Sequence, residues 1–439
     1  MDELIPSLTK LLATLAPAFR KEVFTTFSNM VSAWIVCLGR RTISRVWETT
    51  GKTRVRHHSA AFRLFSQAVW NWDEVMRLLL VAILQTFIPG MRIWITVDDT
   101  LCHKRGAKVA FGGIFLDAVL SSKKHKTFRF GNNWVMLGLG VSMPFRQDRF
   151  FCLPLLWRVA DKRGKKSKKE HRTKPQLAAE MLRILAQWLP GREILVVADS
   201  AYIGKPLLYD RPENVHFIGP ICWRAALTGV TRDQDGLEMS SGRRLPTPLE
   251  ILKNNQKWPS RTRVINFGND KRRRLQVKSL RVCWDTAAGP RPVAIVLVHD
   301  PKGEWRDEAL VSTNPDLKEA DIITGYCRRW SVEVAFGDAK EQMGFHDQGV
   351  WKKESVERAA PFAWFVGTLV MLWYAQESKN HQKPQRHRPW YIKKVVTFAD
   401  MASSCRLALW TNWWQQRADK RPAKHDPHDW LMEYMATAA

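Results

Sequence analysis

Residues 326–340 read YCRRWSVEVAFGDAK and space four chemically different polar side chains at helical intervals. At about 100° per residue, Tyr326, Arg329, Glu333 and Lys340 project within roughly 60° of one another. One narrow stripe of a helix would then carry a phenol, a guanidinium, a carboxylate and an ammonium. The stripe is either a solvated face with intrahelical ion pairs or a carboxylate set among phosphate-binding cations.

Further carboxylates follow two apolar runs that we predict to be strands. WITVDD ends in Asp98 and Asp99, and ILVVAD ends in Asp199. A single aspartate after an apolar run is usually a helix or turn cap. In open α/β sheets, however, ligands gather at the carboxyl ends of the strands. Neighbouring strands would therefore bring Asp199 close to Asp98, with Asp99 as the competitor for the Asp98 position.

Glu333 would complete a set of three carboxylates if its helix packs beside these strands. Three carboxylates can hold two Mg²⁺ ions about 3.5–4 Å apart, one activating a water or 3′-hydroxyl and one stabilising the leaving oxygen of a phosphodiester. We therefore predict catalytic, metal-binding roles for Asp98, Asp199 and Glu333. The other three members of the stripe would bind DNA phosphates: Tyr326, Arg329 and Lys340.

The elements that must position these residues follow from hydrophobic periodicity. Apolar positions recur every three or four residues in the first 90, as in EVFTTFSNMVSAWIVCL, which predicts helices. RIWITVDDT, WVMLGLGVSMP and RFFCLPLLWRVA are strand-like, and the amphipathic stretch KPQLAAEMLRILAQWLP leads into REILVVADSAY as a helix crossover into a parallel strand.

These patterns predict an α/β fold, with a mixed sheet flanked by helices and a β-rich insertion. The expected organisation is a helical N-terminal domain (1–90), a first core segment (91–221), a β-rich insertion domain (222–320), a second core segment (321–380) and a basic C-terminal region (381–439).

Composition indicates the kind of partner. Lys and Arg total 69 against 42 Asp and Glu, a net charge of +27, which points to a polyanion. The segment 162–174 carries eight Lys and Arg residues and one Glu, and is either a solvated loop or a phosphate-contacting one. KRRR at 271–274 is a second basic cluster.

The cysteines and the apolar runs of the chain indicate where the protein is located. The seven cysteines are scattered and never spaced CxxC, which indicates neither a disulfide framework nor a zinc site. The first residues lack the pattern of a signal peptide, and no apolar stretch reaches about 18 residues. We therefore expect a cytoplasmic, nucleoid-associated protein that does not contact membranes.

The motifs together resemble one family. The pattern Tyr-x2-Arg-x3-Glu-x6-Lys at 326–340, with DDT at 98–100 and the aspartate of VVADSAY, is similar to the YREK signature of bacterial insertion-sequence DDE transposases of the insertion-sequence-four-like group. The resemblance extends over roughly residues 90–380.

The resemblance implies an RNase H-like catalytic core interrupted by the β-strand insertion. It also implies that the N-terminal domain (1–90) is a DNA-binding domain for the element ends and that the C-terminal region (381–439) makes DNA or dimer contacts. It implies a homodimer in the synaptic complex, acting on the terminal inverted repeats of the element and on target DNA. Cleavage and joining of 3′ ends would follow a cut-and-paste route that uses two Mg²⁺ ions, with Mn²⁺ as a substitute, and passes through a hairpin on the element end.

Two other functions are compatible with the same residues. One is a nuclease of this fold that does not transpose, and the other is a transposase-derived regulator that binds DNA without cutting it. The presence of all three acids disfavours the regulator.

Overall fold

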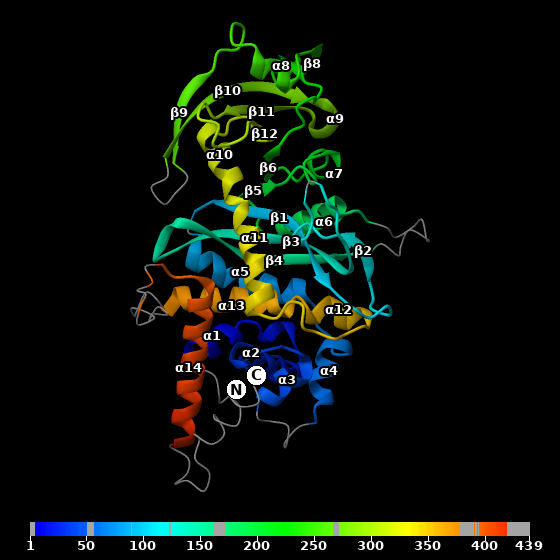
Figure 1. The fold of residues 1–439 in the computed structure, drawn as a ribbon, viewed down its shortest axis with the longest axis vertical. Helices are drawn as coiled ribbons and strands as arrows, with labels where there is room; N and C mark the ends of the chain where they lie inside the picture. The colour runs from blue at the N-terminus through cyan, green and yellow to red at the C-terminus, as the bar shows by residue number, and fades with distance from the viewer. Residues whose placement is uncertain are drawn as a thin grey trace.

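The computed structural model describes residues 5–418, apart from 51–56, 89, 123, 162–171, 267–271, 378–389, 391–392 and 394. Figure 1 shows an elongated molecule with helices at one end, a sheet across the middle and further strands at the opposite end. Most of the basic segment 162–174, the first residue of KRRR and the tail after 418 lie outside the described residues.

The helices predicted in the first 90 residues are confirmed. Asn71 caps the last of them, α5, by accepting a hydrogen bond from the Glu74 N–H at 2.9 Å. Two acids in the first turn of α5 stabilise the same end through the helix dipole. The elements are α1 (Pro6–Ala13), the 3₁₀ helix η1 (Ala16–Ala18), α2 (Lys21–Val36), α3 (Ile43–Thr49), α4 (Ser59–Ser66) and α5 (Trp72–Phe87).

The apolar segment after residue 361 forms α13 (Phe362–Glu377), which is buried from Phe362 to Ala375. A helix that is apolar on all sides needs a partner on every face. Phe27 of α2 packs 5.4 Å from Phe362 between ring centroids, while Thr368 donates to the Pro154 carbonyl of the sheet at 2.9 Å. α13 therefore joins the N-terminal helices and the sheet in one core (Figure 1).

Twelve strands form one mixed sheet in the order β2-β3-β1-β5-β6-β12-β11-β10-β7-β8, with β4 beside β3 and β9 beside β10. β1 pairs in parallel with β5 and antiparallel with β3. The strands are β1 (Arg92–His103), β2 (Gly113–Leu116), β3 (Phe128–Met143), β4 (Arg146–Ala160), β5 (Glu193–Ala198), β6 (Val215–Pro220), β7 (Thr228–Arg232), β8 (Glu238–Arg244), β9 (Arg261–Asn266), β10 (Arg272–Trp284), β11 (Gly289–His299) and β12 (Glu308–Ser312).

The predicted helix crossover is confirmed, because α6 (Lys174–Trp188) leads into β5, which lies parallel to β1. One strand boundary was wrong. β1 does not end at the two aspartates but continues to His103, because the long β3 strand pairs with it along that stretch, down to His103 opposite Gly131. The parallel pairing with β5 stops earlier, at Val97 opposite Ala198.

The β-rich region between 222 and 320 continues the central sheet. β12 pairs antiparallel with β6, with Val311 opposite Gly219, and β11, β10, β7 and β8 follow outward from it. The remaining helices of the described residues are α7 (Lys205–Leu208), α8 (Pro248–Lys253), α9 (Asp285–Ala288), α10 (Glu319–Arg328), α11 (Trp330–Gln342), α12 (Lys353–Ala359) and α14 (Phe398–Ala418).

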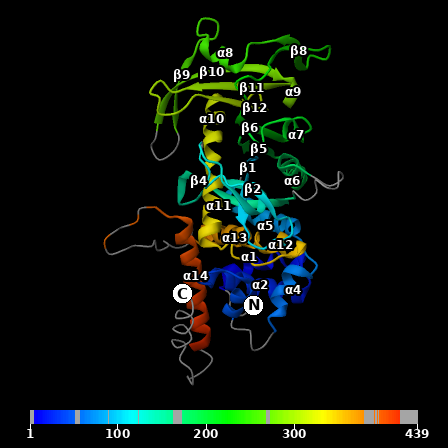
Figure 2. The same cartoon turned by 45° about the vertical axis from the view of Figure 1, so that its right-hand side comes forward.

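The single helix predicted through 326–340 is interrupted at one residue. Arg329 keeps helical backbone angles, but its N–H bonds to the Tyr326 carbonyl at 3.1 Å and its own carbonyl accepts from the Val332 N–H at 3.0 Å. Both bonds have the tighter three-residue spacing of a 3₁₀ turn, which rotates the preceding residues relative to those that follow. α10 and α11 still run on nearly end to end beside the sheet (Figure 2).

Within the described residues, no helix combines the length and the apolar character needed to cross a membrane.

Candidate active site

The α10–α11 junction lies against β1 through two close contacts near Trp94. Gly325 faces this indole, and a Cβ at that position would stand 2.6 Å from a ring carbon. The Arg328 guanidinium lies 4.7 Å from the Trp94 ring centroid and 4.3 Å from that of Phe150, between two aromatic faces. These contacts place the N-terminal turn of α11 beside the middle of β1, where the acids are.

Asp98 and Asp199 occupy neighbouring positions on parallel strands. The β1–β5 register ends at Val97 opposite Ala198. Asp98 is the next residue of β1, and Asp199 is the first residue after β5. Asp199 also caps the following turn, since its Oδ1 accepts from the Ala201 N–H at 2.9 Å. The position of Asp199 is therefore compatible with both roles considered for it, a turn cap and a carboxylate of the site.

The Asp98 carboxyl is largely buried, with a side chain 17% exposed. Burial raises its pKa to about 7, the neighbouring charges of Asp199 and Asp99 add to the increase, and the Asp99 N–H and Arg329 oppose it. The ionised form of Asp98 is therefore disfavoured in the metal-free protein, mainly because the carboxyl is buried.

Asp99 points to different partners because successive side chains of a strand face opposite sides of a sheet. Its Oδ2 pairs with the Lys174 ammonium at 2.5 Å, and its Oδ1 accepts from the Tyr202 hydroxyl at 2.9 Å. Asp99 thus links β1 to the start of α6 and to the turn after β5. Its cationic partner is Lys174, whereas that of Asp98 is Arg329.

Arg329 connects the strand and the helix. One guanidinium nitrogen lies 3.3 Å from Asp98 Oδ2, and another lies 3.0 Å from Glu333 Oε1. Burial alone would lower the pKa of Arg329, but the two carboxylates outweigh it and raise that pKa. An intrahelical ion pair is therefore present, as the solvated-face interpretation predicted, yet the same guanidinium reaches across to β1.

The donor set suits a hard divalent cation in its chemistry. Carboxylate oxygens are the ligands that Mg²⁺ prefers, and the raised pKa of Asp98 indicates charge that a cation would relieve. In the part of the chain that the structure describes, no three His, Cys, Asp or Glu side chains have metal-ligand spacing. Arg329 pairs with both Asp98 and Glu333, so these two carboxylates would have to exchange the guanidinium for a cation in order to bind one.

The two remaining members of the predicted stripe lie on either side of this group. Tyr326 is half-buried beside Glu308 and Arg306, and burial raises the pKa of its phenol. Lys340, two turns beyond Glu333, is half-buried near Cys102 and Asp117, and burial lowers the pKa of its ammonium. The stripe therefore does not converge on one point but extends from the end of α10 along α11.

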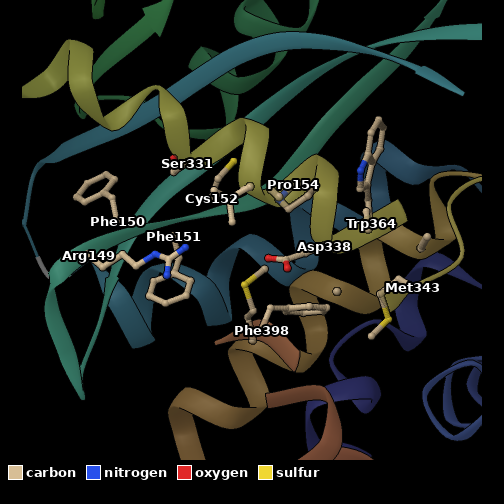
Figure 3. Close-up of a pocket in the computed structure, with 16 residues that line it drawn as sticks. Arg149, Phe150, Phe151, Cys152, Pro154, Ser331, Asp338, Met343, Trp364 and Phe398 are labelled. Atoms are coloured by element: carbon tan, nitrogen blue, oxygen red, sulfur yellow. The ribbon is translucent and has the colours of Figure 1, made fainter. Parts of the chain in front are cut away.

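The opposite face of α11 borders a small, mainly apolar cavity of about 20 Å³ between that helix, β4 and α13, shown in Figure 3. Asp338 and Ser331 line it, and burial raises the pKa of Asp338 to about 6. About 20 Å³ is room for one water molecule. Its walls include none of the predicted site residues, so this cavity is not the active site.

Sequence reasoning missed several residues that support the acids. Tyr202 and Lys174 hold Asp99, although VVADSAY contains the tyrosine and the predicted α6 starts at the lysine. His103, Asp117 and His346 gather near Lys340, at the end of β1. No spacing signal pointed to this group, because its members are distant in the sequence.

A large mixed sheet flanked by helices, with acids at the carboxyl end of parallel strands, is the RNase H-like arrangement of DDE nucleases. Residues 11–279, more than half of the chain, match the family model described as DDE superfamily endonuclease. The chain belongs to this family, whose members are nucleases and transposases that generally use divalent metal ions. No curated protein matched it.

Proposed function

We propose that this protein is a DDE transposase of the YREK group. In this proposal it binds the terminal inverted repeats of an insertion sequence, cuts the DNA with two Mg²⁺ ions and joins the 3′ ends to target DNA, with a hairpin on the element end. The observation that supports the proposal is that Arg329 pairs with Asp98 of β1 and Glu333 of α11, while Asp199, after β5, lies within electrostatic range of Asp98 and Arg329.

The chain's own groups have distinct parts in this chemistry. Asp98, Asp199 and Glu333 would hold the cations, which when bound supply an activated nucleophile and a stabilised leaving oxygen. Arg329 offsets carboxylate charge in the free protein, and its planar fork is suited to grip a DNA phosphate next to the scissile bond. Tyr326 would donate one hydrogen bond to a neighbouring phosphate.

Basic surfaces agree with a DNA substrate, and the location that we propose for the protein is the nucleoid in the cytoplasm. The net charge of the chain is +27, and Arg272 and Arg274 of KRRR are exposed on β10. We assign end binding to the N-terminal helices and dimer contacts in the synaptic complex to the C-terminal region, on the resemblance to YREK transposases. A non-transposing nuclease of the same fold is the alternative function.

The test is incubation with Mg²⁺ and a DNA fragment that carries the candidate element end. We expect nicks and hairpins on a denaturing gel, and joined products when target DNA is added. Asp98→Asn, Asp199→Asn and Glu333→Gln should each abolish cleavage and retain end binding, because each removes a cation ligand without changing side-chain size.

Asp99→Asn is the matched control, since it removes a carboxylate one residue from Asp98 that already has a lysine partner. Full cleavage by Asp98→Asn with loss in Asp99→Asn would reverse the assignment of the first acid. Cleavage without joining to target DNA would favour the nuclease.

A further inference from the structure

A histidine–aspartate pair lies at the end of β1, away from the three acids. His103 Nε2 lies 2.6 Å from Asp117 Oδ2, and since a carboxylate only accepts, the imidazole donates. The other oxygen of Asp117 accepts from the N–H groups of Val119 at 3.1 Å and Leu120 at 3.2 Å. Asp117 is therefore a firmly held anion that fixes the orientation of the ring.

The same imidazole is held from a second side. The His346 ring stacks on His103 with centroids 5.4 Å apart, and His346 Nδ1 accepts from the His103 backbone N–H at 3.2 Å. The His103 side chain nevertheless remains 48% exposed. Nδ1 of His103 is the ring nitrogen left for an external group, because Nε2 is committed to Asp117. In the imidazolium form Nδ1 carries an N–H that can donate to a phosphate oxygen.

Lys340 supplies a cation without a partner in the described part of the chain. Its half-buried ammonium makes no hydrogen bond or ion pair with the described residues, although Asp117 and His346 are within electrostatic range. Lys104, by comparison, donates to the Gln348 carbonyl at 2.8 Å. A partly desolvated ammonium without a partner is costly, and an anionic ligand would remove that cost.

The ligand chemistry that fits is a phosphate and not a metal. Lys340 and Lys104 bring positive charge, and His346 Nδ1 is already occupied as an acceptor. The seven residues from Glu333 to Lys340 span about 10 Å of helix, or about three phosphates of one strand of B-form DNA along its axis.

We infer that His103, oriented by Asp117, and Lys340 together form a second phosphate subsite that holds the DNA backbone about three nucleotides from the cleavage point. The inference rests on the proposed function, and it adds a residue outside the YREK pattern to the DNA contacts. The competing explanation is structural: the His103–Asp117 pair would only connect the end of β1 to the segment after β2.

His103→Gln distinguishes the two explanations. A glutamine amide can still donate to Asp117, but it offers no counterpart of Nδ1. We expect the full-length variant to melt like the wild type and to bind a 30-base-pair duplex of the candidate element end about five- to tenfold more weakly without metal, the loss of one charge-assisted contact. His125→Gln, an exposed histidine outside this group, is the matched control and should bind normally.

The decisive measurement replaces single phosphates of the duplex by neutral methylphosphonates. At one position, the neutral phosphate should weaken binding by the wild type by the same five- to tenfold. Binding by His103→Gln and Lys340→Met, which is already weaker, should fall little further. If the variants bind DNA but no position shows this coupling, the subsite is wrong while the transposase proposal stands. If the coupling is found but Mg²⁺ produces no cleavage, the transposase proposal fails and the subsite stands.

Discussion

The environments of Asp98 and Asp99 predict opposite effects of the same substitution on stability. Folding raises the pKa of Asp98 from about 3.8 to about 7, mainly through burial. A folded-state pKa above the unfolded value makes the ionised carboxylate destabilising. The penalty is small below pH 4, grows between pH 4 and 7, and is complete above pH 7.

The size of this stability penalty follows from the pKa shift of Asp98. About three pKa units at 1.36 kcal/mol each correspond to about 4 kcal/mol at pH 8, and the same linkage leaves about 1.5 kcal/mol at pH 5. Asp98→Asn keeps the acceptor for the Asp99 N–H, which bonds to Oδ1 at 2.8 Å, and removes the charge. We therefore expect the metal-free variant to be about 2–4 kcal/mol more stable than the wild type at pH 8, with a clearly smaller gain at pH 5.

The assay is urea unfolding of the full chain in EDTA at the two pH values. Asp99→Asn serves as the control, since it breaks the pair with Lys174 and should cost about 1 kcal/mol. Mg²⁺ at pH 8 should stabilise the wild type more than Asp98→Asn. An Asp98→Asn variant that is no more stable than the wild type at pH 8, or equally stabilised at both pH values, would refute the reasoning.

Three further expectations can be measured independently. Arg329→Lys should lower strand cleavage at saturating DNA by tenfold or more, because one ammonium cannot reproduce the planar fork with which Arg329 would grip a DNA phosphate; unchanged rates on a denaturing gel would contradict this. Gly325→Ala should reduce the free energy of unfolding by about 1–3 kcal/mol through its clash with Trp94, and an unaltered urea midpoint would argue against close packing there. DNA affinity should fall about a thousandfold or more between 50 and 200 mM salt if six or more phosphates are contacted, whereas a change of less than tenfold in a filter-binding titration would exclude such an interface.

Local patterns in the sequence were sufficient for the elements and for which residues could do chemistry. The apolar run ILVVA followed by Asp199 predicted a buried strand with an acid at its carboxyl end, and the preceding amphipathic helix predicted its parallel pairing with β1. The spacing from Glu333 to Lys340 correctly placed both on the single helix α11. These features depend on periodicity within a few residues, which the sequence displays directly.

Contacts between distant segments were decided only by the tertiary structure. Asp98 and Asp99 are adjacent in the sequence and equivalent in type, but Lys174 and Tyr202 lie beside one and Arg329 beside the other. The extension of β1 beyond the aspartates depends on the length of β3.

The same holds for the tight turn at Arg329 and for the stacking of His103 on His346, 243 residues away. Alternation along a strand specifies that neighbouring side chains face opposite sides of a sheet. Which residues contact these side chains on each face depends on how the helices pack against that sheet. The free energy of that packing is distributed over the whole core.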